Sequence, residues 1–286
     1  MTKYLIGALF ISLHSWSQNI EAYSIFEGSG KKSNYQKMQK GIKDARIVFF
    51  GELHNNAMAH WLKLQLLKSV FATYENITIA MEMFEADDQI VLDEYLQGFI
   101  KEKHLINEAK VWNNYATDYR PIIEYAKLNG IRVIASNIPR RYANLVYREG
   151  FSALDSLSDR SKAWIAPLPI QFDAELPGYK YMIEQMGGHG GGNPQNIAKA
   201  QAIKDATMAH FLIRNLKGTD KIIHYNGSYH SQNREGIVWY VNQSAPSLAV
   251  KTIQVVEQKE IKKLDEKNNG LADFVICVPE DMTKTY

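Results

Sequence analysis

Ile47-Val48-Phe49-Phe50-Gly51-Glu52-Leu53-His54 is the segment that indicates most strongly how this chain folds, and Ile222-Ile223-His224-Tyr225-Asn226-Gly227-Ser228-Tyr229-His230 repeats its plan. In each segment a short apolar run stops at a glycine, and a histidine follows three residues later. Short apolar runs bounded by glycine predict buried strands. In α/β proteins, ligands bind just beyond the C-terminal ends of parallel strands. The two segments therefore predict two strand ends that bring His54 and His230 to one site.

Strands and helices are predicted to alternate along the rest of the chain. This alternation predicts an α/β domain with a mostly parallel sheet and helices on both faces. A loosely alternating segment at 20–27 predicts a first, edge strand. Further strands are predicted at 77–81, 131–135, 248–256 and 272–278, and helices at 57–72, 118–128, 193–216 and 236–242.

Two long insertions interrupt this alternation, at residues 86–128 and 151–192. We interpret them as a helical cap subdomain over the strand ends, within a single domain that covers residues 18–286. The second insertion ends in Gly187-Gly188-His189-Gly190-Gly191-Gly192, which predicts a loop or a close approach to a ligand.

The N-terminus has the pattern of a secretory signal peptide. Lys3 precedes an apolar run from Tyr4 to Leu13, and small residues follow at Ser15 and Ser17. We predict that residues 1–17 are removed and that the mature chain begins at Gln18. No cysteine lies near this junction, so a lipoprotein anchor is not expected, and the protein is predicted to be periplasmic or secreted.

Charge and cysteine content narrow the possible partners. Lys and Arg number 33 against 31 Asp and Glu, a net charge of +2, which gives no electrostatic reason to expect nucleic acid. The single cysteine, Cys277, lies in an apolar β-run and is predicted to be a small core residue.

Polar side chains at the predicted strand ends form the first candidate site: Glu52, His54, Glu82, Asn137 and His230. Carboxylate and imidazole groups bind divalent metals such as Zn or Mn, and they also act as general acids and bases without a metal. His54 precedes a predicted helix N-terminus, whose dipole is expected to disfavour its cationic form. The alternative is that Glu52 and His54 cap the helix and that His230 lies on a solvent loop.

A second set of candidates comes from the cap and its neighbours. Tyrosine and histidine both ligate haem iron, which makes Tyr181 and His189 candidates for that role. His60 either faces the site or lies on the surface. Arg140 can receive a carboxylate or a propionate, because its fork of donors matches such anions, or it is a solvated helix charge. Gln201, Asp205 and Met208 share one face of the long helix, and Asp205 needs a partner there.

The order and spacing of six short motifs resemble those of the ChaN-like haem-binding family. They are Gly51-Glu52-Leu53-His54-Asn55-Asn56, Met81-Glu82-Met83-Phe84 with Gln89, Tyr119, Ala135-Ser136-Asn137-Ile138-Pro139-Arg140, Gln201 through Ala209, and Gly227-Ser228-Tyr229-His230 with Gly236-Ile237. That family is similar to the wider group of Tiki metalloproteases and erythromycin esterases, in which two GxxH motifs and a Glu line one pocket.

The resemblance implies an exported protein of iron or haem uptake or storage, with haem as cofactor, Tyr as iron ligand and a homodimer that holds haems face to face. Haem would lie over the strand ends beneath the cap, with candidate contacts from Tyr181, His189, His54, His60, Asn137, Arg140 and His230. An outer-membrane haem uptake system is the implied partner. We expect a binding protein without redox chemistry of its own. The alternative is a metal-dependent esterase or peptidase in which Glu52, His54, Glu82 and His230 hold Zn or Mn or activate water.

Overall fold

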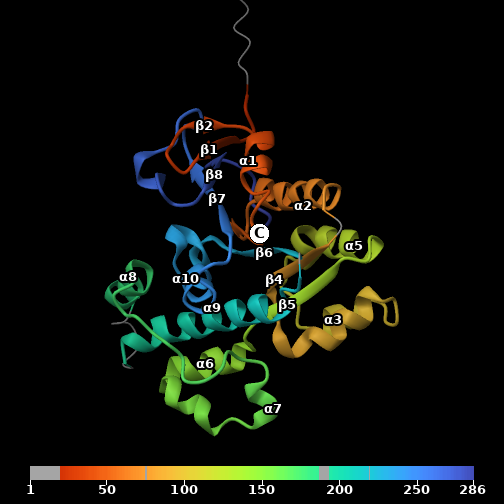
Figure 1. Ribbon diagram of the computed structural model, residues 1–286, viewed down its shortest axis with the longest axis vertical. Coiled ribbons are helices and arrows are strands. Elements are labelled where there is room, and N and C mark those ends of the chain that lie inside the picture. The colour runs from red at the N-terminus through yellow and green to blue at the C-terminus, as the bar shows by residue number, and fades with distance from the viewer. Residues whose placement is uncertain (1–19, 75, 187–192, 219) are drawn as a thin grey trace, which may run out of the picture.

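The protein is built around an eight-stranded, mostly parallel sheet (Figure 1). The structure is a computed structural model that describes residues 20–74, 76–186, 193–218 and 220–286. The strand order is β2-β1-β8-β7-β3-β6-β4-β5, and only the pairs made by β1 are antiparallel. The predicted α/β class is confirmed. The strands are β1 (Ser24–Glu27), β2 (Lys32–Ser33), β3 (Ile47–Glu52), β4 (Ile77–Glu85), β5 (Arg132–Asn137), β6 (Lys221–Gly227), β7 (Val250–Gln258) and β8 (Phe274–Pro279).

Helices cover both faces of this sheet because the strands are apolar on both sides. Val48 and Phe50 of β3 face one core, which contains residues of α2, α3 and α5. Ile47 and Phe49 face the other, where α9 and α10 pack. The helices are α1 (Tyr35–Gly41), α2 (Ala57–Phe71), α3 (Gln89–Leu96), α4 (Glu102–Glu108), α5 (Arg120–Leu128), α6 (Arg140–Glu149), α7 (Asp159–Lys162), α8 (Pro177–Met186), α9 (Gln195–Asn215) and α10 (Ile237–Ser244).

Two strands differ from the prediction. The two-residue strand β2 pairs outside β1, so the predicted edge strand lies one place inward. Strand β4 runs on to Glu85, with an irregular register against β5 after Met81, so Glu82 lies within the strand and not beyond its end. Both features depend on pairing partners far away in the sequence, which local periodicity does not reveal.

Both predicted insertions contain short helices, and their predicted role as a cap over the strand ends stays a prediction. The first contains η1 (Ala86–Asp88) and a π-helical turn, η2 (Tyr115–Tyr119), and the second contains α7 and α8. Within the described residues, no helix is long and apolar enough to cross a membrane. Cys277 is buried in β8, as predicted. The predicted signal peptide and its cleavage site lie outside the described residues.

Candidate functional site at the strand ends

Glu52 is the centre of one half of the predicted site. It is the last residue of β3, is fully buried, and accepts a hydrogen bond of 3.0 Å from Nδ1 of His54. Its other partners come from helices: Tyr119 of η2 donates to Oε1 at 2.8 Å, and the ammonium of Lys63 on α2 forms an ion pair with Oε2. Lys63 is itself fully buried, so Glu52 and Lys63 neutralise each other away from water.

Electrostatics hold this half of the site in a defined charge state. Burial would raise the pKa of Glu52, but Lys63 and the two neighbouring imidazoles lower it to about 2. Burial would lower the pKa of His54, but its hydrogen bond to Glu52 and the charge of Glu82 raise it. The expected shift of His54 toward its neutral form is therefore wrong in direction, because the two carboxylates outweigh the effect of burial on its pKa.

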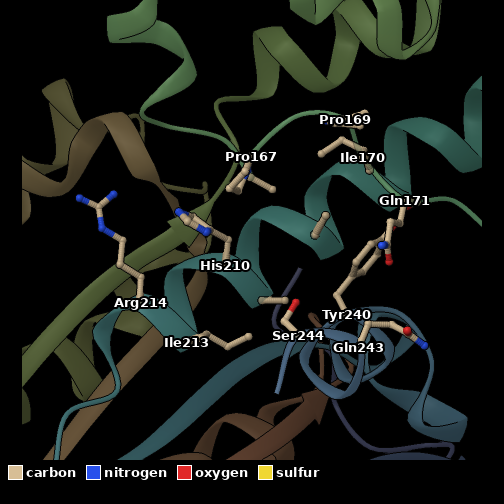
Figure 2. A pocket seen from close by; sticks show the side chains of 13 residues that line it. Pro167, Pro169, Ile170, Gln171, His210, Ile213, Arg214, Tyr240, Gln243 and Ser244 are labelled. Atoms are coloured by element: carbon tan, nitrogen blue, oxygen red, sulfur yellow. The ribbon is translucent and has the colours of Figure 1, made fainter. Parts of the chain in front are cut away.

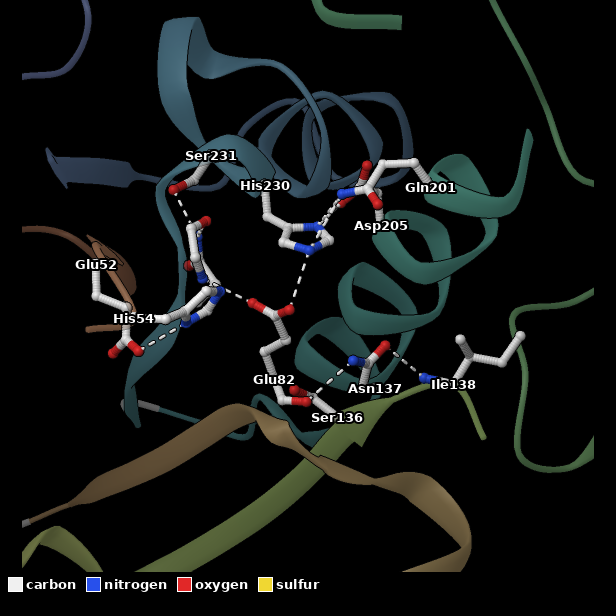
Figure 3. A network of polar contacts seen from close by, with 12 residues as sticks. Glu52, His54, Glu82, Ser136, Asn137, Ile138, Gln201, Asp205, His230 and Ser231 are labelled. Atoms are coloured by element: carbon white, nitrogen blue, oxygen red, sulfur yellow. Dashed lines mark hydrogen bonds and ion pairs between the residues drawn. The ribbon is translucent and has the colours of Figure 1, made fainter. Parts of the chain in front are cut away.

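Glu82 and His230 form the other half of the site (Figure 3). Nε2 of His230 lies 3.1 Å from Oε1 of Glu82, and its Nδ1 lies 2.5 Å from Oδ1 of Asp205 on α9. The second oxygen of Asp205 accepts a hydrogen bond of 2.7 Å from Tyr179 of α8. The partner that Asp205 requires is therefore the imidazole of His230, together with a phenol from the predicted cap.

His230 is a buried cation held between two carboxylates. Burial favours the neutral ring, but Glu82 and Asp205 raise the pKa of His230 to about 10. The neighbouring charge of His230 in turn lowers the pKa of Glu82, against the effect of burial. At neutral pH both ring nitrogens of His230 therefore carry protons and donate to carboxylates.

The two halves meet at Gly227, the last residue of β6. Its backbone N–H donates to Oε2 of Glu82 at 2.7 Å. A Cβ atom at this position would lie 2.5 Å from Nε2 of His54, so glycine is needed for the imidazole to pack against the strand end. The strands β3, β6 and β4 are neighbours in the sheet, which is why the two motifs and Glu82 come together.

His60 and Asn137 support the same region. Nε2 of His60 donates to the backbone oxygen of His54 at 2.8 Å and lies 3.2 Å from Oδ2 of Asp118. Burial and the charge of Lys63 lower the pKa of His60, which favours its neutral form. Asn137 donates through Nδ2 to the backbone oxygen of Glu82 at 3.0 Å. His60 thus lies in the site, where the sequence left its position open.

The remaining candidates lie around this network. Arg140 begins α6 and donates through Nε to Glu85, while most of its side chain is exposed. Tyr181 lies on α8 with 60% of its surface exposed. His189 lies outside the described residues.

The four predicted metal ligands do not present a ready metal site. A metal site needs at least three acidic, histidine or cysteine side chains whose donor atoms lie close together. Among the described residues, one group has such atoms within 4.8 Å of one another: Glu85, Asp87 and Asp88. At the strand ends, Lys63 pairs with Glu52, and His230 lies between Glu82 and Asp205. The proposed Zn or Mn site at Glu52, His54, Glu82 and His230 stays a prediction.

Lys63 and Tyr119 complete the site through helices that the strand-end argument did not consider. Tyr119 was noted within a motif but without a role, and Lys63 was missed. A signal for Lys63 is present in retrospect: it lies three residues after His60, on the same helical face. Both side chains reach Glu52 across the core, from 11 and 67 residues away in the sequence.

Two hollows flank the site. A cleft of about 640 Å³ is lined by Trp112, whose ring centroid lies 5.0 Å from that of His54, and by Lys110, Arg140 and the C-terminal Tyr286. A second cavity, of about 550 Å³, lies between α9, α10 and residues 166–171, with His210, Arg214 and Tyr240 in its wall (Figure 2). None of the predicted site residues that the structure describes lines the second cavity.

Comparison with known proteins gives the same family as the motifs. Residues 38–241 match the family described as haem-binding uptake, Tiki superfamily, ChaN. The fold is similar to that of ChaN of Campylobacter jejuni, solved with cofacial haem binding, at 17% identity over 89% of this chain and 96% of that chain, with a TM-score of 0.64. It is also similar to a protein of Bacillus cereus, at 10% identity over 90% of this chain and 95% of that chain, with a TM-score of 0.53.

A curated relative is similar over most of the chain. Protein RETICULATA-RELATED 5, chloroplastic, of Arabidopsis thaliana is 22% identical in an alignment 270 residues long that covers 87% of this chain and 35% of that protein. The chain therefore spans about a third of the length of the curated relative it matches.

Proposed function

The chain belongs to the ChaN family of haem-binding uptake proteins, and from this premise we propose that it binds haem beside the C-terminal edge of its sheet, in iron or haem uptake or storage. Ferric haem supplies an iron that accepts a phenolate or imidazole as axial ligand. The residues of this chain must therefore offer such a ligand at a surface that a porphyrin can reach.

Most tyrosines of the site cannot serve as that ligand. Tyr119 donates to Glu52 and Tyr179 donates to Asp205, so both hydroxyl groups face a carboxylate. Burial and the nearby carboxylate raise the pKa of each phenol. A phenolate at either position would place two negative charges side by side in the protein interior. Both residues are therefore structural.

Tyr181 is the observation that supports the proposal most directly. It is 60% exposed, and no hydrogen bond to its hydroxyl is found within the part of the chain that the structure describes. The helix that carries it is fixed on the site side by two neighbouring contacts, from Tyr179 to Asp205 and from Tyr229 to the backbone oxygen of Gly178. A rigid helix that presents an accessible phenol suits an axial ligand for a haem held at the surface.

Arg140 suits a haem propionate. Its Nε is bound to Glu85, but 62% of the side chain is exposed, and the cleft beside it also contains Lys110 and Trp112. A guanidinium and an ammonium beside an aromatic ring match the carboxylates and the flat apolar body of a porphyrin. His54 borders the same cleft through Trp112, which makes it the second candidate for an iron ligand.

Titration of the purified protein with ferric haem tests this proposal. We expect a saturable Soret change, with a phenolate charge-transfer band that Tyr181→Phe abolishes. Tyr286→Phe is the matched control, because Tyr286 is another exposed phenol but lies in the cleft with Trp112. Loss of the band in Tyr286→Phe alone would place the ligand in the cleft, and the absence of any saturable change would refute haem binding.

We also propose that haem brings two copies of the chain together and that the protein acts after export, with an outer-membrane haem uptake system as partner. The cofacial haem of the Campylobacter jejuni ChaN motivates the homodimer, and the exposure of Tyr181 is compatible with haems that face each other. Light scattering with and without haem should show a monomer converting to a dimer. A monomer at saturating haem would contradict this arrangement.

His54 is the observation that favours the alternative function, a hydrolase. Its side chain is 33% exposed, and Glu52 orients the ring through Nδ1, which leaves Nε2 to exchange a proton with water or substrate. Such a pair could activate water against an ester or peptide bond, with or without a metal. Hydrolysis of a panel of esters and peptides that is lost in His54→Ala and kept in His104→Ala would support it.

A further inference from the structure

Three carboxylates gather where β4 ends and η1 begins. Glu85 is the last residue of β4, and Asp87 and Asp88 lie in η1. Each offers one oxygen such that the three oxygens lie within 4.8 Å of one another. Glu85 and Asp88 are each only 6% exposed. Close packing of three acids at this depth needs a compensating positive charge.

Two arginines of α6 compensate only part of this charge. Arg140 donates to Oε1 of Glu85, and Arg141 donates to Oδ2 of Asp87 at 2.6 Å. The opposite oxygens of these two acids, Oε2 and Oδ1, are buried and have no hydrogen-bond partner among the described residues. The same holds for Oδ2 of Asp88. Three acceptor atoms therefore have no partner among the described residues, although the charge of Lys110 acts on Asp88 in addition to the two arginines.

We propose that these three carboxylates bind a hard divalent cation of the Ca²⁺ type. All three donors are oxygens, which such cations prefer, and Ca²⁺ holds oxygen ligands at 2.3–2.6 Å in flexible geometry. Oxygens within 4.8 Å of one another are within reach of one such ion. The arginines fix one oxygen of Glu85 and of Asp87, so that the other oxygen of each remains available to the ion.

The close approach of the three carboxylates agrees with this placement. Their oxygens lie within 4.8 Å of one another, so the acids repel each other in the folded chain. A bound cation would reduce that repulsion and would stabilise the folded chain.

The site does not include the histidines at the strand ends, although Arg140, which pairs with Glu85, is also the proposed partner of a haem propionate. Its three ligands come from one short segment, 85–88, which links the end of β4 to α3. Because only three protein ligands are present and two arginines lie beside them, we expect weak binding, with a dissociation constant of about 10⁻⁴ to 10⁻³ M.

Urea unfolding of EDTA-treated protein at pH 7.5 with increasing CaCl₂, at constant ionic strength, tests the proposal. The unfolding midpoint of the wild type should rise and saturate. Asp88→Asn should be more stable than the wild type without Ca²⁺ and should not respond to the ion. Glu94→Gln is the matched control: it removes one acid of α3 outside the cluster and should respond like the wild type. Mg²⁺ at the same concentrations tests selectivity and should have a weaker effect.

Equilibrium dialysis with Ca²⁺ gives a second readout that does not depend on the folding of a variant. One ion per chain should bind to the wild type, and Asp88→Asn or Asp87→Asn should weaken binding at least tenfold. A wild type that binds no Ca²⁺ at 10 mM would overturn the proposal. Binding by Asp88→Asn with wild-type affinity would overturn it as well.

Discussion

Replacing His230 by glutamine should remove much of a stability loss that the wild-type protein shows as pH rises above neutral. The His230 ring is buried between Glu82 and Asp205, and these carboxylates outweigh burial to raise its pKa from 6.5 to about 10. The folded chain therefore keeps a proton that the unfolded chain releases near pH 6.5. This contribution to stability is fully present below about pH 6.5 and is lost as pH rises through about 10.

The magnitude follows from the two pKa values. One unit corresponds to about 1.4 kcal/mol, so the span from 6.5 to about 10 corresponds to a fall of about 5 kcal/mol in the free energy of unfolding. Lysine and tyrosine groups also titrate toward pH 10. The difference between wild type and variant isolates the share that belongs to His230.

Urea unfolding from pH 6 to pH 10 measures this difference. At pH 6, His230→Gln should be less stable than the wild type, because Glu82 and Asp205 lose their shared cation. Between pH 6 and pH 10, however, the free energy of unfolding of the variant should fall by several kcal/mol less than that of the wild type. His104→Gln, which replaces an exposed histidine of α4, should follow the wild-type profile. Should His230→Gln fail to fold, NMR titration of the His230 ring in the wild type gives the pKa directly. Parallel profiles, or a ring that titrates near 6.5, would refute the reasoning.

Three further outcomes are expected. Lys63→Met should lower the free energy of unfolding by about 3–5 kcal/mol in urea, because it leaves the buried charge of Glu52 without its partner. Lys68→Met, which replaces an exposed lysine of the same helix, should lower it by less than about 1 kcal/mol. Equal losses in the two variants would contradict the ion pair. Gly227→Ala should cost about 1–3 kcal/mol and displace the ring of His54, because the new methyl group would meet Nε2; an unchanged His54 ring spectrum in NMR would contradict this contact. Expression with the native N-terminus in a secreting bacterium should yield a chain that begins at Gln18, measured by intact mass, and a full-length product in the periplasm would contradict the predicted cleavage after Ser17.

The sequence predicted the parts of the site that follow from chain order. An apolar run followed by a glycine and a histidine predicts a buried strand with a histidine just after its end. Parallel strands end at the same edge of a sheet, so the sequence could predict that His54, Glu82 and His230 lie close together. That these residues hold a cofactor or catalyse a reaction stays a prediction.

The parts that could not be predicted depend on packing between distant elements. Lys63 reads as an ordinary helix lysine, yet it is fully buried because Glu52 lies opposite it. The pKa of His54 shifts in the opposite direction to the prediction, because the helix N-terminus is visible in the sequence, whereas the placement of Glu52 and Glu82 beside the ring is not. The extension of β4 to Glu85 depends on an irregular register with β5, which no local pattern records.

The two groups of acids at this edge of the sheet differ in how their charges are compensated. This difference indicates which group positions other elements of the protein and which group binds an ion. Glu52 has Lys63, while Glu82 and Asp205 share His230. A metal ion entering there would have to displace an ammonium or the protons of an imidazolium. The network instead holds α8 through the bond from Tyr179 to Asp205, two residues before Tyr181. At Glu85, Asp87 and Asp88, by contrast, three buried oxygens have no hydrogen-bond partner among the residues that the structure describes. His230 and its two carboxylates are therefore a charge-balanced frame that positions α8, while the partly exposed His54 stays a candidate ligand or base. Haem is expected beside this frame, and a cation is expected at the end of β4.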